Sequence, residues 1–464
     1  MNEISLKIFE FITGFTSGFL SFLNIFLYPS TGFQPLPGKL YKIKLIMSNN
    51  KKLTIGLFGF GTVGKGLYEV LQSTPTLQSS IKKICIKNMD KERGIAAGNF
   101  TNDAAVLLGD ADINVIVELI DDADAAFEIV KTALQNGKAV VTANKKMIAE
   151  HFEELLNLQQ QYNTPFLYEA ACCASMPIVR NLEEYYDNDL LQSFRGIING
   201  STNFILTKMF GEDLEFNEAL LLAQQLGFAE SDPKLDIGGF DAANKLSILL
   251  AHSFGVISKT NELLFNGIEQ VSLRDAAVAR QKNYSIKLVA NAIKLKNGKL
   301  AAFVLPQFVT ASDDLYHVEN EFNAVTTESA FADKHFFKGK GAGAFPTASA
   351  VLSDVSALRY NYRYEYKKIH HQACAGLSND FYLKVFVSVD DPGKINKEDF
   401  EWIEEWHNGI GYSWLIGVIH AEKLFYYKWW KQPGLSLICC PEAVIETIDY
   451  RKISKRSLEL AGVV

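Results

Sequence analysis

The sequence predicts an α/β protein whose first domain is a doubly wound parallel sheet, and three observations support this prediction. A short apolar run, Leu53 to Phe58, has the length and composition of a buried parallel strand. Three glycines follow it at GxGxxG spacing and open a segment with helical apolar periodicity, Val63 to Leu71. Strand-like and helix-like segments then alternate as far as Tyr168, which is typical of a sheet with helices on both faces.

The glycine turn has the residues that a dinucleotide pyrophosphate requires. Gly59 lets the chain turn sharply out of the strand, Gly61 lets a phosphate approach the backbone, and Gly64 lets helix and strand pack closely. The helix N-terminus then offers free N–H groups and the positive end of its dipole. A tight turn without a ligand is the alternative, but the strand before it and the helix after it favour a Rossmann-type nucleotide site. The predicted cofactor-binding residues of this turn are Gly59, Phe60, Gly61, Thr62, Val63 and Gly64.

Length, charge and cysteine content limit the class of protein. A chain of 464 residues is long enough for two or three domains, and 48% hydrophobic with 21% charged residues is an ordinary globular composition. The net charge of -7 argues against nucleic acid or an anionic membrane surface as the main partner. Six cysteines, which include the adjacent pairs Cys172–Cys173 and Cys439–Cys440, do not resemble a disulfide framework and fit a reducing, cytoplasmic setting.

Residues 1–46 are rich in Phe, Leu and Ile and differ in composition from the rest of the chain. Early acidic residues make this segment a poor signal peptide, and Glu10 and Asn24 interrupt Ile8 to Tyr28 as a membrane span. Because Met47 stands just before the first strand, we expect it to be the native start and residues 1–46 to be an upstream extension. An interfacial membrane anchor is the alternative.

Two lysines follow strands of the predicted sheet, at the edge where such sheets bind ligands. Lys87 ends the second strand, 81–87, where an acidic residue would hold ribose hydroxyls and a basic residue would accept a 2′-phosphate. The mixed charges after it favour NADP without excluding NAD. Lys145 follows the strand 139–142, although two adjacent lysines also fit a solvated turn. The other strands of this domain are expected at 115–120 and 166–168, and its helices at 123–136 and 147–161.

The segment from Tyr168 to Leu182 joins the last strand to a helix through small residues and Pro177. A turn of this kind can direct several carbonyl oxygens at a hard cation, with Glu169 as the charged ligand. The cysteines 172 and 173 are either a nucleophile with its neighbour or two small buried thiols, and we prefer the buried thiols.

An acidic stretch precedes a lysine near the middle of the chain. Asp241 and Lys245 lie four residues apart in a segment with helical periodicity, so they share one helix face. A surface ion pair is the alternative. Because Glu230, Asp232 and Asp236 come shortly before this pair, the cluster suits an amine-bearing substrate and a proton transfer.

The rest of the chain predicts α+β structure rather than further parallel units. Strands are expected at 193–198, 286–294, 300–308, 381–389 and 414–426, and helices at 199–209, 216–226, 272–282 and 397–406. A second glycine-rich turn, 339–354, runs into a helix. We therefore expect a nucleotide-binding domain at 47–178 completed by 339–360, a substrate domain at 179–338 and a small C-terminal α+β domain at 361–464.

Five motifs together resemble the homoserine dehydrogenase family. They extend from about Leu53 to Leu358 and are GFGTVG, VVTANK, NGSTNF, AESDPKLDIGGFDAANK and GKGAGAFPTASAV. The third and fourth are far more specific than a dinucleotide fingerprint. The resemblance implies an NAD(P)-binding domain joined to an α+β domain that holds the substrate contacts and the interface of a homodimer or higher homo-oligomer. It also implies reversible oxidation of L-homoserine to L-aspartate 4-semialdehyde, in threonine, methionine and isoleucine biosynthesis.

The resemblance also implies roles for the matching residues. Lys245 would be the acid–base group with Asp241 in support, and Lys145 would lie between nicotinamide and substrate. Lys87 falls where many relatives carry an arginine for the NADP phosphate. The implied substrate-binding residues are Glu230, Asp236, Thr202 and Gly200, and Gly341 joins the cofactor-binding residues. A monovalent cation, Na⁺ or K⁺, would be held by Glu169 with the carbonyls of Cys172, Ala174 and Met176.

The chain departs from the family pattern in several places. The turn after Glu169 reads ACCASMP and has less glycine, Asp121 and Asp122 replace a common Gly-Gly pair, and Ser201 replaces a usual threonine. The C-terminal domain lies where many relatives carry an amino-acid-sensing ACT domain, so an ACT-like fold with threonine feedback is a hypothesis.

Two other function classes compete with this interpretation. A semialdehyde dehydrogenase with a cysteine nucleophile would depend on phosphate or coenzyme A. A non-catalytic nucleotide-binding sensor would be expected to lack the acid–base pair, whereas both Asp241 and Lys245 are present.

Overall fold

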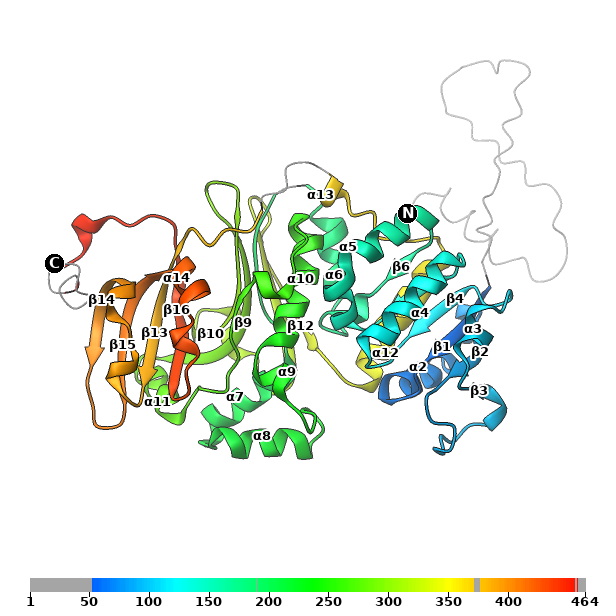
Figure 1. Cartoon of the computed structure of the whole chain (residues 1–464), viewed down its shortest axis with the longest axis horizontal. Coiled ribbons are helices and arrows are strands. Elements are labelled where there is room, and N and C mark those ends of the chain that lie inside the picture. Colours follow the sequence, from blue (N-terminus) through cyan, green and yellow to red (C-terminus); the bar gives the residue numbers. More distant parts are fainter. Residues whose placement is uncertain (1–51, 189, 371–375, 455–456, 458–464) are drawn as a thin grey trace, which may run out of the picture. The chain divides into compact units, whose positions relative to one another are not determined.

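The computed structural model describes residues 52–188, 190–370, 376–454 and 457 (Figure 1). The predicted upstream extension, residues 1–46, and its boundary at Met47 lie outside these residues. Within the described ranges, no helix is both long enough and apolar enough to cross a membrane. Two sheets organise this part of the chain, one parallel and one mixed.

The first sheet has six parallel strands in the order β3-β2-β1-β4-β5-β6. This is the strand order of a dinucleotide-binding Rossmann domain, so the predicted fold class is confirmed. Its strands are β1 (Leu53–Phe58), β2 (Ser79–Cys85), β3 (Phe100–Thr101), β4 (Val115–Glu118), β5 (Ala139–Thr142) and β6 (Phe166–Leu167). The helices between them are α2 (Thr62–Gln72), α3 (Ala104–Leu108), α4 (Ala123–Gln135) and α5 (Lys145–Tyr162).

A helix from much later in the chain also packs against this domain. In α12 (Ala344–Leu358), the carbonyl oxygen of Ala344 lies so close to α2 that a Cβ at Gly66 would be 2.8 Å from it. The buried face of α12 is formed by small and aliphatic side chains, among them Ala348 and Val351. Close helix packing of this kind needs small residues on both helices, and the chain supplies them here.

The second sheet has ten strands in the order β12-β11-β7-β9-β10-β16-β13-β15-β14, with β8 paired to β10. Its strands are β7 (Leu191–Ile197), β8 (Leu264–Phe265), β9 (Tyr284–Lys294), β10 (Leu300–Thr310), β11 (Phe322–Ser329), β12 (Asp333–Lys340), β13 (Tyr382–Val389), β14 (Phe400–His407), β15 (Ser413–His420) and β16 (Leu435–Ile445). The helices of this region are α7 (Gly200–Glu212), α8 (Phe216–Gln225), α9 (Lys234–Ile237), α10 (Phe240–Phe254) and α11 (Leu273–Gln281), and α10 and α11 pack against β9.

The C-terminal strands extend this second sheet. β16 pairs with β10 in parallel through Cys439 and Gln307, and β13, β15 and β14 follow in order. Together with α14 (Ala421–Tyr427) they form a hydrophobic cluster that also includes Phe303 and Leu305 of β10. The expected α+β character of the C-terminal region is confirmed, whereas its ACT-like character stays a prediction.

Several element predictions were wrong in detail. In place of the helix predicted at 397–406, a short 3-10 turn (Lys397–Asp399) leads into strand β14, and the strand predicted at 414–426 divides into β15 and α14. β14 shifts register twice against β15, between Phe400 and Trp402 and again between Ile403 and Glu405. Because a bulge inserts a residue, Phe400 and Ile403 both become buried although they are three residues apart, and this spacing imitates a helix.

Candidate functional site

The turn between β1 and α2 has the geometry of a pyrophosphate site. Gly59 has a φ of +91°, and a Cβ there would lie 2.4 Å from the carbonyl oxygen of Leu119. A Cβ at Gly64 would lie 2.4 Å from the carbonyl oxygen of Gly59. At Gly61, by contrast, a Cβ would meet nothing within 4 Å, and no side chain caps the N-terminus of α2. Open space before free N–H groups fits the phosphates of a dinucleotide.

The other predicted cofactor residues differ in exposure. The ring of Phe60 is buried and packs edge-on against Phe100 at a centroid distance of 5.3 Å, so only the backbone of Phe60 can face a nucleotide. Thr62 is exposed and Val63 is half-buried. Lys87 is exposed just after β2, where its ammonium group is accessible to a ligand at the carboxyl edge of the sheet.

Asp241 connects two lysines that are far apart in the sequence. Its Oδ2 atom lies 2.7 Å from Nζ of Lys245, and its Oδ1 atom lies 3.0 Å from Nζ of Lys145. Lys145 is the first residue of α5 in the Rossmann domain, whereas Asp241 and Lys245 lie in the first half of α10. Nζ of Lys245 also donates to the carbonyl oxygen of Ile198 at 2.8 Å. Because Asp241 and Lys245 are both buried, the alternative of a surface ion pair is wrong.

Asn199 belongs to this cluster, although the sequence did not single it out. Its side-chain amide donates to Asp241 at 2.8 Å and to Asp236 at 2.7 Å. Its oxygen accepts from the backbone N–H of Thr202 at 2.8 Å and so caps α7. An asparagine before a helix is an ordinary N-cap, and this is why its second role has no distinct sequence signal.

The charges of the cluster shift the ionisation of its members in opposite directions. Burial opposes ionisation of Asp241, but the charges of Lys145 and Lys245 outweigh it and hold the pKa of that carboxyl well below its usual range. The charge of Asp241 in turn raises the pKa of Lys145. For Asp236, burial and the neighbouring charge of Asp241 raise the pKa. Asp241 is therefore a stable carboxylate, whereas Asp236 lacks a sufficient cation of its own.

The remaining predicted substrate residues surround this cluster. Thr202 is buried, and its hydroxyl bonds Asn199 at 3.0 Å. Gly200 begins α7, where a Cβ would lie 2.6 Å from the carbonyl oxygen of Glu321. Glu230 is exposed, and its charge contributes to the raised pKa of Lys145.

Glu169 lies in a second buried group of charges. Its carboxylate accepts the backbone N–H groups of Val179 at 2.9 Å and Arg180 at 3.0 Å. Asp354 of α12 accepts the N–H of Glu169 at 2.9 Å and pairs with the guanidinium of Arg180. Burial, followed by the charge of Asp354, raises the pKa of Glu169 to about 8. Two buried carboxylates thus share one guanidinium, an arrangement that a nearby cation would stabilise.

The turn that follows Glu169 is formed without glycine. Cys173 and Ala174 adopt the left-handed region, with φ of +58° and +38°. Met176 places its carbonyl oxygen 2.8 Å from the N–H of Ile178. Both cysteines are buried, and burial raises the pKa of Cys173 to about 11, so the preferred interpretation of buried thiols is confirmed.

One group of His, Asp and Glu side chains among the described residues is close enough to hold a metal ion, and it lies elsewhere. It consists of Asp124 on α4 with Glu150 and His151 on α5. Its two carboxylates are exposed, and the group shares no residue with the predicted cation ligands around Glu169.

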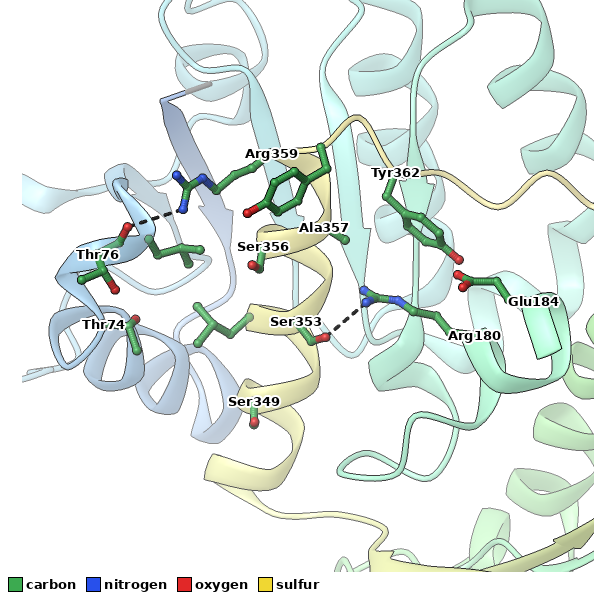
Figure 2. A pocket seen from close by; sticks show the side chains of 13 residues that line it. Thr74, Thr76, Arg180, Glu184, Ser349, Ser353, Ser356, Ala357, Arg359 and Tyr362 are labelled. Carbon is green, nitrogen blue, oxygen red and sulfur yellow. Dashed lines mark hydrogen bonds between the residues drawn. The ribbon is translucent and has the colours of Figure 1, made fainter. Parts of the chain in front are cut away.

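A cavity of about 850 Å³ lies beside α12 (Figure 2). Arg180 reaches Ser353 from one wall, and Arg359 reaches the carbonyl oxygen of Thr76 on the other. None of the predicted catalytic, substrate-binding or cofactor-binding residues lines this cavity. The candidate active site is therefore the Asp241 cluster near the Rossmann domain and not this cavity.

Comparisons with known proteins find similar chains. The family model for homoserine dehydrogenase matches residues 177–356, and the model for the homoserine dehydrogenase NAD-binding domain matches residues 59–169. The homoserine dehydrogenase of Helicobacter pylori is 36% identical over 312 residues, which cover 66% of this chain and 73% of that protein. That of Bacillus subtilis is 34% identical over 322 residues, which cover 68% and 74%.

Solved structures show the same similarity. A homoserine dehydrogenase from Thiobacillus denitrificans has a TM-score of 0.73 at 28% identity, over 84% of this chain and 98% of that chain. A homoserine dehydrogenase mutant from a hyperthermophilic archaeon, solved in complex with NADPH, has a TM-score of 0.58 at 28% identity, over 68% and 100%. Its complex contains the cofactor class that the glycine turn of this chain fits.

Proposed function

Because this chain belongs to the homoserine dehydrogenase family, we propose that it interconverts L-homoserine and L-aspartate 4-semialdehyde with NADP and that the Asp241 cluster is its catalytic centre. The observation that carries this assignment is the Asp241 carboxylate between the ammonium groups of Lys145 and Lys245. This carboxylate joins the nucleotide-binding domain to α10, the helix with the acid–base lysine. The substrate carbon that exchanges the hydride must lie near both the nucleotide-binding domain and this lysine.

Lys245 is the proposed acid–base group. In the direction of aldehyde reduction its ammonium donates a proton to the carbonyl oxygen, and in alcohol oxidation the neutral amine accepts the hydroxyl proton. Asp241 holds this side chain through a 2.7 Å contact. NADP, when bound at the glycine turn, supplies the hydride transfer. Lys145 lies on the Rossmann side of Asp241 and orients the substrate oxygen toward the nicotinamide.

Asp236 and Glu230 are proposed to bind the amino group of the substrate. Asp236 has a raised pKa because its burial and the charge of Asp241 are not fully compensated. A substrate ammonium group beside it would supply the missing positive charge. Thr202 and Gly200, at the start of α7, complete the substrate side of the site.

Three further assignments rest on the same family membership. Lys87 is proposed to accept the 2′-phosphate, which makes NADP the preferred cofactor. Glu169, with the carbonyls of Cys172, Ala174 and Met176, is proposed to hold Na⁺ or K⁺, and the surplus carboxylate beside Arg180 supports this. We also propose a cytoplasmic homodimer or higher homo-oligomer, with the nucleotide domain at 47–178 and 339–360, the substrate and dimerisation domain at 179–338 and a regulatory region at 361–464.

The test is absorbance at 340 nm with L-homoserine and NADP or NAD in separate reactions. The wild type should produce a signal, and Lys245→Ala and Lys145→Ala should lose nearly all of it. Lys146→Ala is the matched control, because this adjacent lysine is exposed and its nearest carboxylate partner is Glu150, at 3.9 Å. Folded wild-type protein without a signal from either cofactor would reject the proposal.

A further inference from the structure

Asn323 on β11 is a fully buried amide with both polar atoms unpaired. In the part of the chain that the structure describes, neither Oδ1 nor Nδ2 makes a hydrogen bond of normal geometry, although the side chain is 0% exposed; its polar contact is with the thiol of Cys173, a weak hydrogen-bonding group. Buried polar groups are almost always hydrogen-bonded, because an unpaired one loses its water without compensation. The chain therefore keeps a group at this position that an apolar residue could replace at no cost to folding.

Three segments of the proposed active site meet at this amide. A Cβ at Gly341 would lie only 2.0 Å from Nδ2, so the backbone of the glycine-rich turn touches the amide directly. A Cβ at Gly200, at the start of α7, would lie 3.5 Å from Oδ1. The thiol of Cys173, in the turn after Glu169, also faces the Asn323 side chain. Asn323 thus contacts both the Gly341 turn on the cofactor side of the site and the start of α7 on the substrate side.

The glycine-rich turn is fixed at its two ends but not between them, since at its far end the carbonyl oxygen of Gly343 accepts the N–H of Thr347 at 3.2 Å and begins α12. The carbonyl oxygen of Lys340 accepts the N–H and the hydroxyl of Ser175 at 3.2 and 2.9 Å, which fixes the end of β12. In the described residues, the next two backbone N–H groups, those of Gly341 and Ala342, make no hydrogen bond. Unpaired backbone donors therefore lie next to an unpaired amide oxygen.

We propose that Asn323 is a positioning residue for the cofactor, and that its amide hydrogen-bonds the backbone of the Gly341 turn when this turn closes on NADP. Oδ1 accepts an N–H of the turn and Nδ2 donates to one of its carbonyls, which leaves the turn in one conformation. Only glycine at position 341 lets the backbone approach this closely. The inference rests on the proposed function, since it needs NADP to bind beside this turn.

Two substitutions test the proposal, with NADPH fluorescence titration and cofactor-free thermal unfolding as readouts. Asn323→Ala removes the amide, and Asn323→Asp keeps its shape but loses the donor. Both should weaken NADPH binding roughly tenfold, which corresponds to about 1.4 kcal/mol. The melting temperature of Asn323→Ala without cofactor should change by less than about 2 °C, because the free protein loses only the weak contact with the Cys173 thiol.

Asn203→Ala is the matched control. Asn203 is equally buried, but its amide donates to the carbonyls of Val318, Asn320 and Phe322 at 2.9–3.1 Å. This variant should melt several degrees lower, since three buried or partly buried carbonyls lose a donor. If Asn323→Ala melts as low as the control, or if both Asn323 variants bind NADPH like the wild type, the proposal is overturned. Failure of the wild type to bind NADPH would instead overturn the proposed function, and this inference with it.

Discussion

Asp241→Asn is the substitution that tests the cluster most directly, because it removes one charge and keeps the shape. The side chains of Asp241 and Lys245 are 5% and 8% exposed, so the ammonium of Lys245 would stay buried with neutral carbonyl oxygens but no negative charge beside it. Breaking a buried ion pair from one side costs about 3–5 kcal/mol. The Lys145 side chain is 43% exposed and can regain water, so we expect the lower end, about 3 kcal/mol.

The loss should be visible in two measurements. Urea unfolding reports the free energy of unfolding, and the initial rate at 340 nm with L-homoserine reports catalysis. The rate should fall by a factor of about 100 or more, since positioned acid–base groups contribute about 10²–10⁴. Asp232→Asn is the matched control, because Asp232 lies in the same acidic stretch but is exposed, and both quantities should stay near wild type.

Two results would refute different parts of this reasoning. A variant that keeps its rate within about threefold of wild type would show that Asp241 does not position Lys245. A variant with a greatly reduced rate but an unchanged or higher free energy of unfolding would show that burying the three charges costs as much free energy as their mutual attraction contributes. The catalytic assignment would then stand, and the energetic argument would not.

Three other predictions concern a buried carboxyl, a strained backbone position and an exposed lysine. Burial raises the pKa of Glu118 to about 7 in the folded protein, whereas its pKa in the unfolded chain is near 4.5. The folded protein therefore loses stability as the pH rises between these two values, by about 3 kcal/mol. In Glu118→Gln, the free energy of unfolding in urea should no longer show this loss between pH 4 and 8. Ala174→Gly should raise the melting temperature, because glycine removes a left-handed strain of about 1 kcal/mol. Lys87→Glu should raise the KM for NADP by roughly tenfold or more and leave that for NAD nearly unchanged.

The Rossmann domain could be predicted because its signals are local. β1 and β5 are short apolar runs buried on both faces, and the glycine turn lies between a strand and a helix. β14 could not, because its two bulges give Phe400 and Ile403 the spacing of a helix face. The strand β12 gave no clear signal either, since it is an edge strand with mostly exposed side chains.

The candidate site was predictable only in part, for a different reason. The spacing of Asp241 and Lys245 places them on one face of α10, and this needs no knowledge of the fold. The contact of Asp241 with Lys145 joins two helices that are about a hundred residues apart in sequence, and only the resemblance to a family linked them beforehand. Asn199 and Asn323 were missed because a single asparagine carries no periodicity, and their importance lies in what surrounds them.

The position of the cluster follows from the helices that begin around it. Lys145 is the first residue of α5, Asn199 caps α7, and Asp241 lies in the first turn of α10. Each N-terminus adds a partial positive charge, which favours the ionised form of Asp241 and opposes the ammonium of Lys145. The ammonium of Lys145 therefore depends on the Asp241 carboxylate for its stabilisation more than an exposed lysine would. The 3.0 Å contact between them links the cofactor domain to α10. Under the proposed function, a substrate with its own ammonium and carboxylate groups would meet both signs of charge there, and this would be the electrostatic reason for an amino acid to bind at this site.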